Sequence, residues 1–263
     1  MRAVKHVTLS DNDATGVSYN QSPELTCDGI CPYCYAHKRT KKQAERLCVQ
    51  LGLGKGLITS NSGPITWPTQ QACYRRNTRF LNSLTSEGVA QEAQWIAKSL
   101  TRRGYDNLRF NGCGDSTPNS TLLAFYLGCL GKQAYGFTRK EEHVWALCMH
   151  CDLEVGSPGF VRPHFLLSVD RWSTDSMVES RVAAGIALNK CERVLAYMAL
   201  ADETSASIKA KPFWKYIKVV LGYHATMAHT RVGVARECPK TAGKGITCQQ
   251  CRRCFSADRR GRR

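Results

Sequence analysis

The alternation of strands and helices along the second half of the chain restricts its fold more than any other feature. Five short runs rich in aliphatic and aromatic residues have the length and composition of strands: 107–112, 134–138, 164–169, 193–201 and 216–223. Helical stretches lie between them: 119–130, 141–151 and 174–189. Strands that are joined through helices pair in parallel, so the sequence predicts an α/β fold, a partial βα barrel of mostly parallel strands.

The first hundred residues are less regular. Residues 1–26 are polar and turn-rich, and residues 57–70 predict an irregular segment because they contain Gly63, Pro64 and Pro68. Helices are expected over 35–50 and over 86–102, the second with Ser86 as its N-cap. We expect one α/β domain over 1–236 and a Cys-rich, Arg-rich extension over 237–263.

Composition limits the cellular context. No run of roughly 18 apolar residues is present, and the N-terminal residues lack the apolar core of a signal peptide, so we expect a cytoplasmic protein without a membrane span. The chain has 14 Cys, which in a reducing compartment favour metal binding over disulfides. Scattered Cys, including the pair Cys148 and Cys151, are expected to be buried packing residues. His164, at the start of an apolar strand, is expected to be a hydrogen-bonded core or edge residue.

The first Cys group has the spacing C-x3-C-x2-C, formed by Cys27, Cys31 and Cys34, with the aromatic Tyr33 before the last Cys. Three thiolates cannot complete a structural zinc site, which takes four protein ligands. They can hold three irons of a [4Fe–4S] cluster and leave the fourth iron open for chemistry. This group therefore predicts a reactive cluster.

The segment CDGICPYC resembles the radical S-adenosylmethionine (SAM) superfamily signature CxxxCxφC, in which φ is aromatic. The resemblance implies that Cys27, Cys31 and Cys34 bind the cluster, with Tyr33 at the aromatic position. It also implies that SAM chelates the open iron and is cleaved to a 5′-deoxyadenosyl radical by an electron from an external donor.

A glycine-rich acidic turn follows the strand at 107–112. It resembles the segment of the same superfamily whose acidic residue receives the SAM amino group, although this chain has GCGD where the family has GGE. By that match Asp115 contacts SAM, and Gly112 and Gly114 let the backbone approach it closely. From the residues alone, Asp115 could equally form an Asx turn before the next helix.

The second Cys group, near the C-terminus, has the spacing C-x9-C-x2-C-x2-C. Its members are Cys238, Cys248, Cys251 and Cys254. Four thiolates satisfy either a zinc ion or a closed iron–sulfur cluster, so the sequence predicts a second metal whose identity stays open. The layout of the whole chain, from the CYA after the first group to the final CxxCxxCF, is similar to that of uncharacterised phage-encoded proteins. That similarity implies a phage origin and the cytoplasm of a host.

The net charge of +16 indicates a polyanionic partner, such as a nucleic acid or a nucleotide. The positive residues concentrate beside the two Cys groups: Lys38, Arg39, Lys41, Lys42, Arg252, Arg253, Arg259 and Arg260. The sequence thus favours a radical SAM-like enzyme that modifies a nucleic acid or nucleobase, including phage DNA or tRNA. One alternative is a 7-deazaguanine DNA transglycosylase-type enzyme with Asp115 or Asp170 as its nucleophile and structural metals. A second is a zinc-stabilised nucleic-acid-binding protein without catalysis.

Overall fold

Six parallel strands form a single open sheet in the computed structural model, which describes residues 6–11, 16–27, 68–111, 114–199 and 203–222 and five positions near the C-terminus. The strands are β1 (Ser18–Tyr19), β2 (Asn107–Phe110), β3 (Gln133–Thr138), β4 (His164–Val169), β5 (Leu195–Ala199) and β6 (Ile217–Gly222). Their order in the sheet is their order in the sequence, and every neighbouring pair is parallel. This is the arrangement of a partial βα barrel and confirms the predicted fold class.

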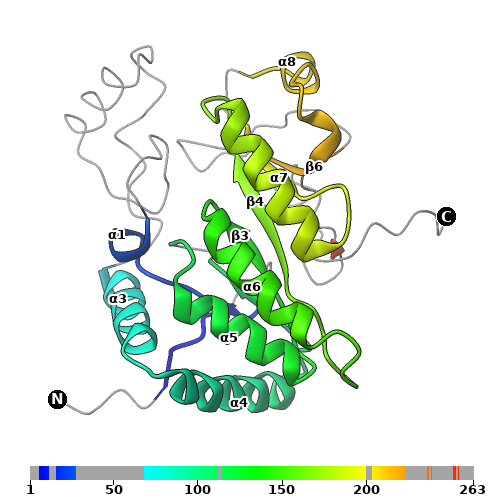
Figure 1. The fold of residues 1–263 in the computed structure, drawn as a ribbon. Coiled ribbons are helices and arrows are strands. Elements are labelled where there is room, and N and C mark those ends of the chain that lie inside the picture. The colour runs from blue at the N-terminus through cyan, green and yellow to red at the C-terminus, as the bar shows by residue number, and fades with distance from the viewer. Residues whose placement is uncertain are drawn as a thin grey trace.

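The described helices lie between successive strands along the chain (Figure 1). They are α1 (Pro23–Thr26), α3 (Pro68–Asn82), α4 (Ser86–Arg102), α5 (Pro118–Cys129), α6 (Glu141–Leu153), α7 (Asp175–Asn189) and α8 (Ser205–Lys209), with a 3-10 turn at Trp214–Tyr216. The bounds of α4 match the sequence prediction, but its N-cap is Thr85, whose hydroxyl accepts the Gly88 N–H, and not Ser86. None of these helices combines the length and the apolar character that crossing a membrane requires.

The sequence did not predict β1, α1, α3, α8 or the 3-10 turn. The strand β1 has only two residues, too short to show the alternation of a strand within a polar stretch. The helix α3 starts at Pro68, so residues 68–70, which were expected to be irregular, form its first turn. Proline fits the first turn of a helix, so Pro68, which suggested an irregular segment in the sequence, instead begins a helix.

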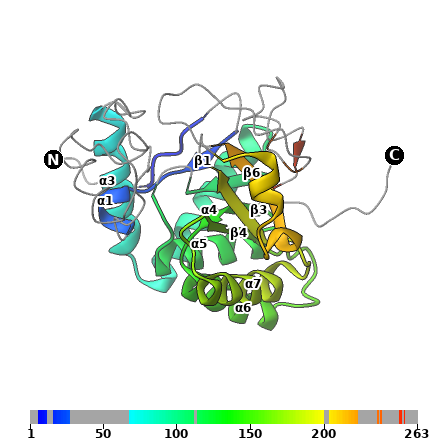
Figure 2. The same ribbon diagram turned by 90° about the horizontal axis from the view of Figure 1, so that it is seen from above.

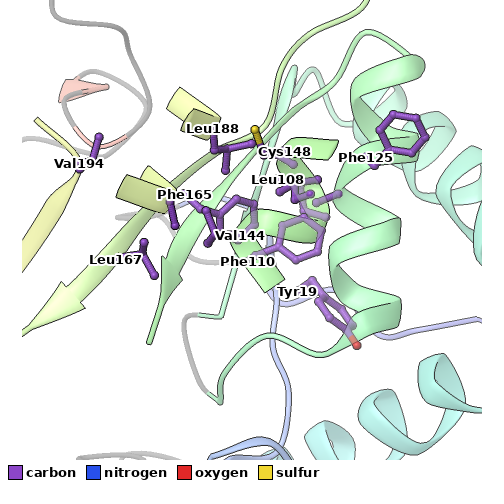
Figure 3. Packing of buried hydrophobic residues seen from close by; sticks show 14 of the residues in the cluster. Tyr19, Leu108, Phe110, Phe125, Val144, Cys148, Phe165, Leu167, Leu188 and Val194 are labelled. Carbon is purple, nitrogen blue, oxygen red and sulfur yellow. The ribbon is translucent and has the colours of Figure 1, made fainter. Parts of the chain in front are cut away.

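The main core lies between the sheet and its helices. Helices α5, α6 and α7 lie on one side of the sheet (Figure 2), and alternate strand residues such as Phe110, Phe165 and Leu167 pack toward them. Figure 3 shows Val144 and Cys148 of α6 near Leu108 and Phe165. Cys148 and Cys151 are both buried in this cluster, which confirms the expected packing role. Burial raises the pKa of both thiols, which keeps them protonated and unreactive.

The opposite face of the sheet carries a second, smaller apolar cluster. Leu166, Ala196 and Val219 form it, and Cys238 and Cys254 of the C-terminal extension pack against it. The extension also joins the edge of the sheet, because Val220 N–H donates to the Arg236 carbonyl and Cys238 N–H donates to the Val220 carbonyl. The described residues of the extension therefore pack directly on the α/β domain.

Candidate active site

The carboxyl ends of the first four strands bring together residues that are far apart in the sequence. In a parallel sheet these ends share one edge, where ligands bind in βα folds. Cys27 follows β1, Asp115 follows β2, Arg139 follows β3 and Asp170 follows β4. Three of these four, Cys27, Asp115 and Asp170, were candidates from the sequence.

The loop after β1 packs tightly on the turn after β2. Asp115 N–H donates to Thr26 Oγ1 at 2.8 Å, and Gln21 Nε2 donates to the Asp115 carbonyl at 3.0 Å. Gly114 has a φ of +79°, and a Cβ there would lie 2.7 Å from the Gln21 carbonyl oxygen. Thr26 Oγ1 in turn lies 3.9 Å from Cys27 Sγ. The first predicted cluster ligand is thus held beside the glycine–aspartate turn.

The Asp115 carboxylate is buried and accepts hydrogen bonds on both oxygens. Ser116 N–H donates to Oδ1 at 2.7 Å, and the Thr138 hydroxyl donates to the same oxygen. Arg139 N–H donates to Oδ2 over a longer distance of 3.3 Å. The bond from Ser116 N–H forms within the turn itself, so Asp115 organises the start of α5 as well as facing the ends of β2 and β3.

The Asp170 carboxylate is the second acidic group at this edge. Its Oδ2 accepts from Arg139 Nη2 at 2.7 Å, and its side chain is only 4% exposed. Its Oδ1 accepts from Trp172 N–H at 3.0 Å and from the Ser173 hydroxyl at 3.1 Å. Arg139 therefore connects the two carboxylates, through its backbone N–H to Asp115 and through its guanidinium to Asp170.

Further polar residues at this edge were not identified from the sequence. Gln21, in the loop after β1, contacts Asp115, and the His143 ring on α6 lies 2.9 Å from Ser116 Oγ. Single Gln and His residues in a loop or helix carry no motif, so only their position in space reveals them. Arg171, next to Asp170, stacks on Trp172 with 4.8 Å between its Cζ and the ring centroid.

The other predicted site residues divide into two groups. Arg252 is one of the described residues, and its Nη2 lies 3.1 Å from Oδ2 of Asp106, the residue directly before β2. Among described residues, no three His, Cys, Asp or Glu side chains gather closely enough to hold a metal ion. The remaining predicted positions lie outside the described residues: Cys31, Tyr33, Cys34, Lys38, Arg39, Lys41, Lys42, Gly112, Cys248, Arg253, Arg259 and Arg260.

His164 is buried, as expected, but the predicted hydrogen bonding does not extend to its Nε2. It starts β4, and its Nε2 has no hydrogen-bond partner among the residues that the structure describes. Burial lowers the pKa of His164 to about 3, and the nearby charge of Lys218 acts in the same direction. The imidazole is therefore neutral in the folded protein at ordinary pH.

His164 is expected to weaken the fold in acid. An unfolded histidine has a pKa near 6.5, so below that pH the unfolded chain binds a proton that the folded chain cannot bind until about pH 3. Between pH 7 and pH 5 the free energy of unfolding should therefore fall by about 2 kcal/mol from this residue alone. Urea unfolding of wild type and His164→Phe at both pH values measures the difference.

The Phe variant should lose this part of the acid sensitivity, whereas His150→Phe, at an exposed position of α6, should retain it. Equal acid sensitivity in wild type and His164→Phe would contradict the assignment of a buried, neutral His164.

Comparison with other proteins leaves the family open. No family model matches the chain, and a search of curated proteins finds no significant match.

Proposed function

We propose that this protein is a radical SAM-like iron–sulfur enzyme that modifies a nucleic acid or a nucleobase-type substrate. The observation that carries the proposal is the contact between Thr26, in the loop after β1, and the Gly114–Asp115 turn after β2. Cys27, the first residue of the Cys motif, thereby lies next to the acidic turn that resembles the same superfamily, at the carboxyl edge of a sequentially ordered parallel sheet.

Two described residues, Cys27 and Asp115, have side chains of the type that the proposed cofactors need. Cys27 supplies a thiolate at the edge of the sheet, and Thr26 ties its loop to Asp115. Asp115 Oδ2, with one long hydrogen bond, offers an acceptor for the SAM amino group. When bound, a [4Fe–4S] cluster with SAM would supply a carbon-centred radical at this edge, given an external electron donor. The C-terminal Cys group would hold a second iron–sulfur cluster or a zinc ion against the face of the sheet that carries Leu166, Ala196 and Val219.

Positive side chains at the same edge suit a phosphate-bearing substrate. Arg139, Lys140 and Arg171 follow β3 and β4 and are partly exposed. Together with the net charge of +16, they favour a nucleic acid or nucleotide as the partner, in the cytoplasm of a host if the protein is phage-encoded. The transglycosylase alternative gains less support, because both carboxylates that could act as nucleophiles are engaged by several donors.

Iron loading tests the proposal. Protein purified without oxygen should be brown and contain about four irons at the first Cys group, and Cys31→Ala should lose them while keeping the C-terminal metal. Cys73→Ala, a half-buried Cys of α3 outside both groups, should keep the wild-type iron content. Incubation with SAM and dithionite should release 5′-deoxyadenosine from wild type and from Cys73→Ala only.

Two results would remove the radical mechanism. Unchanged iron content in Cys31→Ala would show that this residue holds no cluster. A protein that contains zinc alone and releases no 5′-deoxyadenosine would favour the nucleic-acid-binding alternative.

A further inference from the structure

A chain of hydrogen bonds runs from the Asp115 carboxylate to the imidazole of His143. The Thr138 hydroxyl contacts Asp115 Oδ1, Ser116 Oγ lies 2.7 Å from Thr138 Oγ1, and His143 Nδ1 lies 2.9 Å from Ser116 Oγ. Asp115, Ser116 and Thr138 are all buried, whereas His143 is partly exposed at the start of α6. The chain therefore connects an interior carboxylate with an imidazole at the surface.

The number of protons in this chain determines its direction. Thr138 has one hydroxyl proton and donates it to Asp115, while its oxygen also accepts the Lys140 N–H at 3.1 Å. Ser116 must therefore donate to Thr138, since no other proton lies between the two oxygens. With its proton used in this way, Ser116 Oγ can only accept from His143, so Nδ1 carries the hydrogen.

This direction leaves the other ring nitrogen of His143 as a base. In a neutral imidazole only one nitrogen carries hydrogen, so Nε2 has a lone pair. Burial lowers the pKa of His143, and the charge of Lys140 acts in the same direction. The charges of Glu142 and Asp115 act in the opposite direction but do not outweigh burial, so the ring is neutral at pH 7. None of the described residues donates a hydrogen bond to Nε2. An imidazole oriented by a carboxylate through its Nδ1–H has the arrangement that enzymes use for general bases.

We propose that His143 Nε2 is a general base for a substrate bound at the carboxyl edge of β3, oriented by the relay Ser116–Thr138–Asp115. The proton leaves an N–H or O–H group of the substrate and forms Nε2–H, and the substrate keeps the electron pair. The positive charge on the resulting imidazolium is balanced by the Asp115 carboxylate at the far end of the relay. Arg139 and Lys140, which follow the same strand, suit an anionic substrate at this place.

Chemical modification of the full-length protein tests this assignment without requiring a known substrate or an occupied cluster. Diethyl pyrocarbonate acylates an imidazole nitrogen that has an accessible lone pair, and peptide mass spectrometry gives the rate at each of the seven His residues. His143 should react quickly at pH 7, and buried His164 should not. Because the readout is independent of iron, failure of this proposal is distinguishable from failure of the proposed function.

Thr138→Val tests the relay most directly. Without the Thr138 oxygen, Ser116 loses its acceptor and donates instead to His143 Nδ1, which moves the ring hydrogen to Nε2 and removes the exposed lone pair. The modification rate of His143 should fall by about fivefold, the ratio that corresponds to one neutral hydrogen bond. Nitrogen-15 NMR of the full-length protein should show the same change of tautomer directly.

Two control variants separate the relay from general damage to the fold. Thr138→Ser keeps the hydroxyl and should react at the wild-type rate. Thr121 lines a small cavity together with Ser116, Thr138 and His143, but its hydroxyl donates to the Thr117 carbonyl and to no other described residue. Thr121→Val should therefore also leave the rate unchanged. An unreactive His143 in wild type, or equal rates in Thr138→Val and wild type, would overturn the proposal. So would a Thr138→Ser variant as slow as Thr138→Val.

Discussion

Replacing Gly114 by Ala is expected to destabilise the protein by about 3 kcal/mol, because an added Cβ meets fixed backbone in a conformation that L-residues avoid. The φ of +79° costs about 1 kcal/mol for any residue with a side chain. The remainder comes from the Gln21 carbonyl oxygen and Thr26 Oγ1, which would lie 2.7 and 2.9 Å from the new carbon. Urea unfolding followed by circular dichroism measures the loss.

Gly104→Ala is the matched control for this substitution. Gly104 has a similar φ of +73°, but nothing lies within 4 Å of the position that its Cβ would occupy. Its substitution should cost only the conformational part, about 1 kcal/mol. Equal losses at both glycines would mean that the loop after β1 does not pack on the β2 turn as described. On the proposed function, Gly114→Ala should also lower the iron content, because it displaces the loop that carries Cys27.

Replacing Asp170 by Ala should cost about 3 kcal/mol, since it removes the partner of a guanidinium at the sheet edge. Arg139 Nη2 lies 2.7 Å from Asp170 Oδ2, the Asp170 side chain is 4% exposed, and two further donors lose their acceptor. Burial makes the loss large, because Arg139 cannot recover full hydration in the folded protein. The change in the free energy of unfolding at pH 7 is again the measurement.

An ion pair of the same length on the surface provides the comparison. Arg162 Nη2 also lies 2.7 Å from an aspartate oxygen, that of Asp152, but the Asp152 side chain is 47% exposed. Water replaces the lost contact there, so Asp152→Ala should cost less than about 1 kcal/mol. If Asp170→Ala proves no more harmful than Asp152→Ala, the burial of the Asp170 pair is not what gives it strength.

The functional site was predictable where it follows a motif or the end of a strong strand. Cys27 belongs to a spaced Cys group, and Asp115 and Asp170 come directly after strands whose apolar pattern is clear. Gln21 and His143 escaped prediction because their roles come from contacts across the chain: Gln21 reaches Asp115, 94 positions away, and His143 reaches Ser116, 27 positions away. Sequence spacing carries no information about such distances.

The hydrogen-bond partners of buried polar groups were also beyond the sequence. His164 starts an apolar strand, and that pattern indicated correctly that the residue is buried. Whether a buried imidazole finds a partner depends on which side chains the neighbouring strands place beside it, and here none of the described ones reaches Nε2. The same holds for Asp115, whose donors come from a turn, a neighbouring strand end and the residue after it.

Local patterns in the sequence determined the type of β2 to β6 and of α4 to α7, and with them the class of the fold, because the periodicity of apolar residues reflects which faces of a helix or strand are buried. The bounds of α4 and β4 match the predicted ones. Tertiary structure decided which strand ends meet, and so it placed the Cys27 loop against Asp115 and aligned two side chains, Thr138 and Ser116, between Asp115 and His143. The physical reason is that hydrogen bonds between distant segments depend on distances of a few ångströms, which are set only when the sheet and its helices pack together.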